Sequence, residues 1–313
     1  MAAVSLALQI VVTGLAAGGV YGLIAVGHSL VYRLTGIVHL AYGDLIGLGV
    51  FTTLLVAAGT GPVTQETAGG PRFLVALLAG LLVCVAAGSG SYLYAVQPYL
   101  ARRSTIGWVA AIVAIAFAIR AVVGAVFQQP SYVFPDPIPF RDIGRSGFVT
   151  VGGASLQVRS FFVIAAAVGL ALLAGLTLDR TRFGRGLQAI AADSEGARIV
   201  GVPVDTFVAL AFGLAGGLAA LAAIIAAPSG SVTVETGALL GLKGLVAALA
   251  VRFGSPLSAM VAGLALGLGE ATIANAHVGS LELGPSYRTV LPLALVLLFV
   301  ALRPQLEAVE TEE

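Results

Sequence analysis

Residues 14–51 read GLAAGGVYGLIAVGHSLVYRLTGIVHLAYGDLIGLGVF, which is two apolar runs joined near a single arginine, Arg33. A membrane-spanning helix needs about 20 mainly apolar residues to cross a hydrocarbon layer roughly 30 Å thick. Glycine and alanine are spread through both runs, and small residues let helices in lipid approach one another closely. The stretch therefore predicts two neighbouring spans, over residues 5–30 and 36–58.

The rest of the chain has the same apolar character. Of its 313 residues, 58% are hydrophobic and only 10% are charged, whereas a soluble domain carries about 25% charged residues. Seven further apolar runs predict spans over residues 73–96, 106–127, 160–178, 204–227, 237–252, 255–275 and 286–302. We expect an all-α polytopic membrane protein with about nine transmembrane helices (eight to ten), built as a single transmembrane domain over residues 1–313.

The basic residues predict an orientation, because arginine and lysine accumulate on the cytoplasmic side of membrane proteins. With the charged stretch 179–205 in the cytoplasm, nine basic residues lie inside and five lie outside. The inside set is Arg33, Arg102, Arg103, Arg180, Arg182, Arg185, Arg198, Arg252 and Arg303. The outside set is Arg72, Arg141, Arg145, Arg159 and Arg288. We therefore expect the N-terminus outside, the C-terminus inside, and residues 179–203 as a cytoplasmic loop.

The largest segment on the outer side is expected at residues 128–160. It opens with the proline-rich run QQPSYVFPDPIPF, which must be extended or turned because proline disfavours helix at the residue before it. Residues 148–158, FVTVGGASLQV, alternate apolar and polar side chains around Gly152–Gly153. That pattern predicts a small extracytoplasmic β-hairpin with a two-residue turn, either a cap on helix ends or a contact for an external partner.

Two spans are short or interrupted by glycine. The pair Gly36 and Gly43 and the pair Gly237 and Gly244 each have a spacing of seven residues, and each follows a longer predicted helix. In the expected topology the two longer helices run in opposite directions. Together these features predict an inverted repeat whose broken helices line a pathway.

Four charged residues lie inside predicted spans: Asp44, Arg120, Lys243 and Glu270. An ionised side chain in a membrane usually faces protein or water and has a partner. Their distances from the span ends predict the pairs Asp44–Lys243 and Arg120–Glu270. The pairs either lock helices together or border the path of a polar solute, and His39 and Tyr42 are further candidates to line that path.

Other functional classes have little support in the residues. The three histidines show no metal-ligand spacing and the single cysteine, Cys84, lies in an apolar run, so no metal site is expected. A net charge of +1 argues against nucleic-acid binding. The chain contains no G-x-x-x-x-G-K-[ST] phosphate loop, so we expect a protein that is not an enzyme and has no ATPase site of its own.

The charged stretch 179–205, DRTRFGRGLQAIAADSEGARIVGVPVD, interrupts this apolar chain. Asp193 can cap a short helix, Glu195 and Arg198 suit the two ends of its dipole, and Gly201 can adopt the left-handed conformation that ends it. Residues 179–185 are interpreted as the charged anchor of the preceding span and residues 186–192 as a connector. A helix this short needs support from a partner, and Ala197 and Val200 share the face expected to be exposed for it.

Motifs from one end of the chain to the other resemble the permease subunits of branched-chain (hydrophobic) amino acid importers of the ATP-binding-cassette (ABC) type. Residues 14–51 are similar to the first two helices of that family. GRGLQAIAADSEGARIVGVPVD (184–205) is similar to its cytoplasmic loop, GALLGLKGLVAALAVRFGSPLSAMVAGLALGLGE (237–270) to a segment carrying G-L-K, and FVALRPQ (299–305) to its closing F-R-P-Q. Departures from the family pattern include Asp193 for asparagine, Ser194 for proline and Gly196 for alanine.

The resemblance implies a function and a set of partners. The loop of such permeases supplies a coupling helix that docks on an ATPase subunit, here Asp193, Ser194, Glu195, Gly196, Ala197, Arg198, Ile199, Val200 and Gly201. It implies two ATP-binding subunits that hydrolyse the ATP, no cofactor bound to this chain, a second related permease, and an external solute-binding protein. It also implies a multi-pass location in the lipid bilayer of a bacterial-type inner membrane.

The sequence is also compatible with other functions. An ion-coupled secondary transporter of a small polar solute could use Asp44, Lys243 or Glu270 as coupling groups, but it has no need of a capped docking helix. A structural scaffold would leave the charges inside the spans unexplained. Within the importer family, branched-chain or other apolar amino acids lead as solutes, with urea, short amides and small carboxylates as alternatives.

Overall fold

The computed structural model describes residues 2–61 and 71–275, apart from 103, 137, 139 and 141–146, together with 277–278, 281–282, 290 and 294. The predicted span 286–302 lies outside the described residues except for 290 and 294. The long helices are α1 (Ala2–Thr35), α2 (Tyr42–Ala58), α3 (Pro71–Gly90), α5 (Thr105–Val126), α6 (Val158–Arg180), α9 (Val204–Ala226), α10 (Thr236–Ala250) and α11 (Pro256–Ala274). Short helical segments are the π-helix η2 (Ser91–Val96), α4 (Gln97–Ala101), α7 (Arg182–Ala192), α8 (Ser194–Ile199) and the 3₁₀ turn η4 (Ala227–Ser229).

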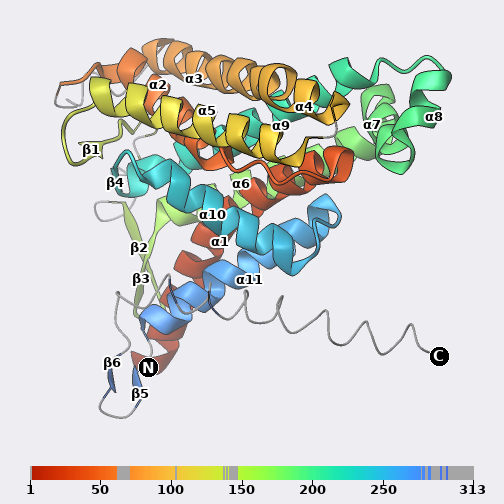
Figure 1. The fold of residues 1–313 in the computed structure, drawn as a ribbon. Helices are drawn as coiled ribbons and strands as arrows, with labels where there is room; N and C mark the ends of the chain where they lie inside the picture. The colour runs from red at the N-terminus through yellow and green to blue at the C-terminus, as the bar shows by residue number, and fades with distance from the viewer. Residues whose placement is uncertain are drawn as a thin grey trace, which may run out of the picture.

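Eight of the nine predicted spans coincide with these helices, so the all-α polytopic fold is confirmed. Among the described residues, six helical stretches are long and apolar enough to cross a membrane, and α2 and α10 are shorter apolar helices. The stretch Pro71–Leu100 is longer than the predicted 73–96 because η2 and α4 continue α3. Figure 1 shows the helices running roughly between two ends of the molecule, one carrying α7 and α8 and the other carrying the β-strands.

Short strands gather at the end of the molecule opposite α8 (Figure 1). β2 (Phe148–Val151) pairs antiparallel with β3 (Ala154–Gln157), and Gly152 and Gly153 between them have φ of 56° and 83°. Positive φ at both turn residues is what a tight two-residue hairpin requires, so the predicted hairpin is confirmed. Elsewhere β1 (Tyr132–Val133) pairs with β4 (Ser231–Val232), and β5 (His277–Val278) pairs with β6 (Leu281–Glu282).

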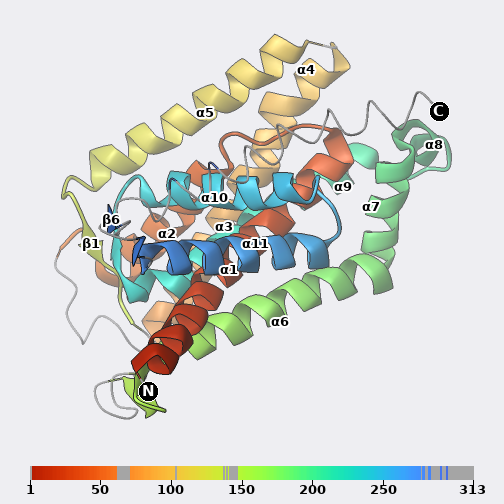
Figure 2. The same ribbon diagram turned by 90° about the horizontal axis from the view of Figure 1, so that it is seen from below.

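Glycines decide how closely α1 and α11 pack, and the two helices cross near the centre of the fold (Figure 2). A Cβ added at Gly18 would lie 2.7 Å from the Cα of Leu264 and 2.8 Å from the carbonyl oxygen of Gly263. A Cβ at Gly267 would collide with the backbone of Gly14 and Gly18. The backbones of α1 and α11 are therefore in direct contact, as expected for membrane helices in which small residues recur every four positions.

The two segments expected to be short or interrupted by glycine are short helices, α2 and α10, and each is continuous through its glycines, so the predicted breaks are not found within them. α1 ends at Thr35, Gly36 has φ of 67°, and α2 begins only at Tyr42, so residues 36–41 are a non-helical connector and the predicted span start at 36 is wrong. In the second half of the chain, residues 227–235, which include η4 and β4, separate α9 from α10. The inverted relation between α1–α2 and α9–α10 remains a prediction.

The two short helices α2 and α10 pack on each other near their first turns. A Cβ added at Gly43 would lie 2.8 Å from the Cα of Ala238, and a Cβ at Gly237 or Gly241 would collide with the backbone of α2. The N-terminal ends of α2 and α10 therefore overlap inside the helical body, where the unpaired N–H groups of each helix create partial positive charge.

The charged loop folds into two helices rather than one. The expected connector 186–192 belongs to α7, whose start is capped by Thr181 accepting a hydrogen bond from the N–H of Gly184 at 3.0 Å. Glycine is unfavourable inside a helix, but a Cβ at Gly184 would collide with the carbonyl oxygen of Leu178. Tight packing therefore explains a glycine within a helix whose Leu187 and Ile190 are buried.

Candidate functional site

Asp44, Arg120 and Glu235 form a charged seam between the starts of the two short helices α2 and α10. Nη2 and Nε of Arg120 donate to Oδ1 of Asp44 at 2.9 and 3.1 Å, and Nη1 lies 4.0 Å from Oε2 of Glu235. Asp44 lies in the first turn of α2, and Glu235 immediately precedes α10. Arg120, on α5, therefore bridges the N-terminal ends of α2 and α10.

The other two charged residues inside the spans form a separate, closed pair. Nζ of Lys243 on α10 lies 2.9 Å from Oε1 of Glu270 on α11, and the Tyr21 hydroxyl of α1 donates to Oε2 of Glu270 at 2.9 Å. Lys243 also donates to the Tyr21 oxygen at 3.0 Å and lies over its ring. The Glu270 side chain is 0% exposed and that of Lys243 is 12% exposed, so three helices are joined in their interior.

The predicted pairings Asp44–Lys243 and Arg120–Glu270 are therefore wrong, although the four residues do form two ion pairs. Distance from the end of a helix gives depth alone, and the partner also depends on which way each side chain points around its helix. α5 packs on α2 and α10 packs on α11, which places Arg120 beside Asp44 and Lys243 beside Glu270. The sequence offered no signal for Tyr21 or Glu235 as members of these clusters.

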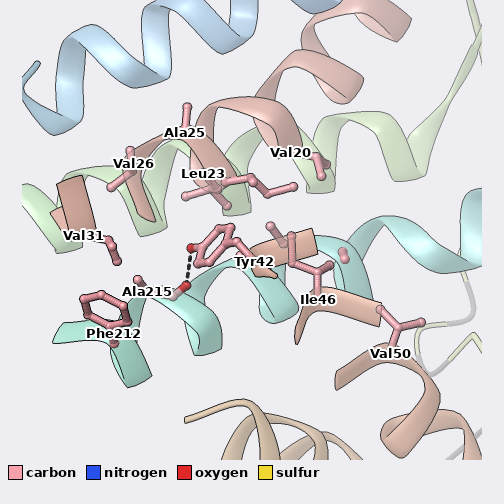
Figure 3. Packing of buried hydrophobic residues seen from close by; sticks show 14 of the residues in the cluster. Val20, Leu23, Ala25, Val26, Val31, Tyr42, Ile46, Val50, Phe212 and Ala215 are labelled. Atoms are coloured by element: carbon pink, nitrogen blue, oxygen red, sulfur yellow. Dashed lines mark hydrogen bonds between the residues drawn. The ribbon is translucent and has the colours of Figure 1, made fainter. Parts of the chain in front are cut away.

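His39 and Tyr42, predicted to line a pathway, are both packed inside the protein. His39 is 2% and Tyr42 1% exposed. The Tyr42 hydroxyl donates to the carbonyl oxygen of Ala215 on α9 at 2.6 Å, and Figure 3 shows its ring among aliphatic side chains of α1 and α9. Nε2 of His39 is 2.8 Å from the Ser91 hydroxyl of the π-helix. In this conformation both residues hold the start of α2 against its neighbours.

The short helix α8 has both of the ends that its sequence predicts. Oδ1 of Asp193 accepts from the N–H groups of Glu195 and Gly196, each at 3.0 Å. Gly201 has φ of 88°, and the N–H groups of Gly201 and Val202 bond back to the carbonyls of Arg198 and Ala197, each at 3.0 Å. This is a Schellman ending, so α8 starts and stops at fixed residues.

The expected exposed face of α8 is wrong in one position. Ala197 is buried, at 4% exposed, whereas Ile199 and Val200 are 86% and 79% exposed. The hydrogen bond from Val202 to Ala197 folds the chain back over Ala197, which sequence spacing alone does not reveal. The apolar surface that α8 presents to solvent therefore consists of Ile199 and Val200.

Polar contacts connect α8 to the spans. Nη2 of Arg198 donates to both carboxylate oxygens of Asp205, at 3.0 and 3.2 Å, and Asp205 lies in the first turn of α9. The Tyr92 hydroxyl of the π-helix donates to Oδ1 of Asp205 at 3.1 Å. Ser91, the neighbour of Tyr92, contacts His39 in the connector before α2. The side-chain contacts of the π-helix therefore link α8 and α9 to the connector that precedes α2.

An ion pair at the hairpin end was also missed from sequence. Nη1 of Arg159 lies 2.6 Å from Oδ2 of Asp136, and the guanidinium lies over the Phe140 ring. The arginine side chain is 5% exposed, although the sequence suggested only an external charge. Asp136 belongs to the proline-rich segment, which this pair fastens to the start of α6.

A cavity of about 500 Å³ opens near α7, between α1, α6, α7 and α11. Its walls are mostly aliphatic, with Ser29, Arg33 and Gln188 among the polar groups. The four charged residues inside the spans do not line it, so the cavity and the charged seam are separate features. Among the described residues, no three His, Cys, Asp or Glu side chains are placed to hold a metal ion.

Apolar spans that carry ion pairs in their interior, with two short apolar helices packed together near their N-terminal ends, are typical of polytopic membrane proteins of the transporter class. A family model described as "Branched-chain amino acid transport system / permease component" matches residues 10–300. The chain belongs to this family and is a multi-pass protein of the bacterial inner membrane.

Curated relatives cover nearly the whole chain. The high-affinity branched-chain amino acid transport system permease protein BraD of Pseudomonas aeruginosa is 29% identical over 306 residues, which is 95% of this chain and 94% of that protein. The corresponding permease proteins LivH of Escherichia coli K12 and of Salmonella typhimurium are each 27% identical over 304 residues, with the same coverage. These likenesses identify a permease component of a transport system.

Proposed function

We propose that the chain is the membrane-spanning subunit of an ABC importer that moves branched-chain or related small amino acids inward. The observation that carries this proposal is α8, a helix fixed at both ends that exposes Ile199 and Val200 while Arg198 ties it to α9. Exposed apolar side chains on a rigid, protruding helix suit a groove on a partner protein.

The energy for transport comes from partner subunits. Two ATP-binding subunits hydrolyse ATP, and this chain binds no cofactor directly. Closure of the ATPases moves α8 as a rigid body, and the Arg198–Asp205 contact passes this movement to α9. The spans then alternate between outward-open and inward-open arrangements, which is rigid-body switching about packed interfaces.

Two further partners complete the importer. A second, related permease packs beside this chain in the bilayer, and an external solute-binding protein delivers solute at the hairpin end. The named relatives favour branched-chain amino acids. Urea, short amides and small carboxylates remain the alternatives, and binding assays on the cognate external protein decide between them.

The proposal is tested by uptake into proteoliposomes that contain the assembled importer. Uptake should require ATP inside the vesicles, and the double variant Ile199→Asp/Val200→Asp should abolish solute-stimulated ATPase activity. Ala189→Asp is the matched control, because Ala189 is exposed on the neighbouring α7 and lies outside the α8 surface. Normal ATP-driven uptake by the double variant would show that α8 does not couple the subunits.

The alternative is an ion-coupled secondary transporter, and the buried Lys243–Glu270–Tyr21 cluster is the observation that favours it. Interior ionisable groups of this kind form proton relays in some transporters. Uptake that proceeds without ATP and collapses when the ion gradient is dissipated would establish this alternative.

A further inference from the structure

The side chains of Arg120 and Glu235 in the charged seam are more exposed than those of the buried Lys243–Glu270 pair. The side chain of Arg120 is 36% exposed and that of Glu235 is 63% exposed, whereas Asp44 is 7% exposed. Arg120 lies inside the candidate span Ile106–Val126, six residues before its end. A partly exposed guanidinium therefore lies inside an apolar span, and an exposed carboxylate lies immediately before the apolar helix α10.

The helix that carries Arg120 stands apart from the body of the molecule. Figure 2 shows α5 crossing one side of the fold with α10 lying below it, and only 11% of the most apolar window of α5 is buried. Exposure of ionised groups to lipid is costly, so such groups normally face a water-filled cavity or protein. The side of the molecule between α5 and α10 is thus suited to contact a polar solute.

The apolar residues beside Glu235 follow the same face of α10. Leu239 and Leu242 are four and seven residues after Glu235, a spacing that places all three side chains on one face of a helix. Leu239 is 52% exposed and Leu242 is 48% exposed. An acid, a base and an aliphatic strip therefore lie next to one another on an open surface.

We propose that Arg120 and Glu235 form a transient contact site for the zwitterion of an apolar α-amino acid on the transport pathway. This inference rests on the proposed function and names the chemistry by which the permease meets its solute. Arg120 receives the carboxylate, Glu235 receives the ammonium, and the aliphatic side chain lies along Leu239 and Leu242. The two charged groups of an α-amino acid are joined through one carbon, which matches a base and an acid held side by side.

The geometry of Arg120 supports this division of roles. Nε and Nη2 of Arg120 both donate to Asp44, and these two hydrogen bonds fix the orientation of the guanidinium. The contact from Nη1 to Glu235 is loose, at 4.0 Å, beyond the 2.7–2.9 Å of a strong charged hydrogen bond. A zwitterion can enter this open pair without breaking the Asp44–Arg120 contact, whereas the Lys243–Glu270 pair is closed and buried.

The site is tested by thiol labelling at Leu239→Cys in the assembled importer, in vesicles without ATP. The native thiol, Cys84, is 0% exposed and donates to the Leu45 carbonyl at 3.1 Å, so the new thiol is the accessible one of the two. The reagents are methanethiosulfonates that carry either an ammonium or a sulfonate group. Leucine, 4-methylpentanoate and 3-methylbutylamine are the protecting solutes, because the last two each lack one charge of the first.

Leucine should slow labelling about fivefold more than either analogue does. Each analogue lacks one charged group, and one charge contact in a hydrated site contributes about that factor. Glu235→Gln should remove the difference between leucine and 4-methylpentanoate, and Asp179→Asn, an exposed carboxyl removed elsewhere, should not. Circular dichroism verifies that each variant is folded. Equal protection by all three solutes, or no labelling by either reagent, would overturn the inference.

This experiment is independent of ATP and of the external binding protein. Loss of zwitterion-specific protection in an importer that still carries out ATP-driven uptake would overturn the contact site alone. Uptake that needs no ATP would overturn the proposed function, whatever the labelling shows.

Discussion

Lys243 and Glu270 illustrate what a single buried charge requires of its surroundings. Glu270 is 0% exposed, and its charge is balanced by Lys243 and a hydrogen bond from Tyr21. Removal of one member of a buried ion pair leaves an uncompensated charge, whereas replacement of both members is often tolerated. Comparison of the single and double variants therefore separates the cost of an unpaired buried charge from the contribution of the ion pair itself.

We expect Lys243→Met to lower the stability of the permease by about 3–5 kcal/mol. The double variant Lys243→Met/Glu270→Gln should recover most of this loss, because the unpaired carboxylate is gone. Thermal unfolding of the detergent-solubilised protein measures both. A single variant as stable as the parent would show that Glu270 does not depend on Lys243.

At the residue scale, the sequence predicted which residues matter better than it predicted their partners. Asp44, Arg120, Lys243 and Glu270 were found because charge is rare inside apolar spans. Their pairing depends on how helices rotate against one another, and that depends on glycine contacts spread over several helices. Arg159 was missed for a related reason, since its partner Asp136 lies in an irregular segment.

At the element scale, glycine contacts decide which helices can touch. Gly18 on α1 faces the backbone of α11, whereas a Cβ added at Gly169 on α6 would meet no atom within 4 Å. The two glycines lie in similar apolar helices, but only the first is at a helix crossing.

Gly18→Leu should therefore prevent close packing of α1 on α11 and destabilise the fold by several kcal/mol, since overpacking costs about 1–3 kcal/mol even where side chains can move. Gly169→Leu should be nearly neutral, because its side chain enters open space. The yield of monodisperse protein and its melting temperature provide the measurement. Equal behaviour of the two variants would contradict the packing role of Gly18.

The π-helix is an element whose position between α8 and α2 suggests a role in coupling. π-helical turns are rare and often occur at functional sites. Within this one, Tyr92 bonds Asp205 while Ser91 contacts His39. Tyr94, two residues further on, is 81% exposed and so provides an internal comparison.

We expect Tyr92→Phe to reduce the amount of solute moved per ATP hydrolysed, and Tyr94→Phe to leave this ratio unchanged. Loss of a hydrogen bond to a charged acceptor weakens the hold of α9 on the π-helix by about 1.5–3 kcal/mol. Parallel assays of uptake and ATP hydrolysis give the ratio. If both variants keep the parental ratio, the Tyr92–Asp205 contact is structural only.

At the scale of the whole molecule, the sequence predicted the architecture well because its signals are long. Runs of about 20 apolar residues locate the spans, and the glycine pair at 152–153 locates the hairpin. The sequence was less accurate at helix ends: α2 begins at Tyr42 instead of 36, and the connector 186–192 is part of α7. Those boundaries depend on tertiary contacts such as Gly184 against Leu178, which no local pattern contains.

Orientation in the membrane is the whole-molecule property that follows from charge. The α8 end carries Arg180, Arg182, Arg185 and Arg198, and the positive-inside tendency predicts that this end lies in the cytoplasm. In cells with a permeabilised outer membrane, Thr150→Cys in the hairpin should react with a membrane-impermeant thiol reagent. Ser194→Cys in α8 should react only after the inner membrane is opened, and both positions are exposed on the protein surface. The reverse pattern would show that the topology is inverted and that α8 lies on the side of the membrane that lacks ATP. One labelling experiment therefore tests both the orientation of the chain and the coupling role of α8.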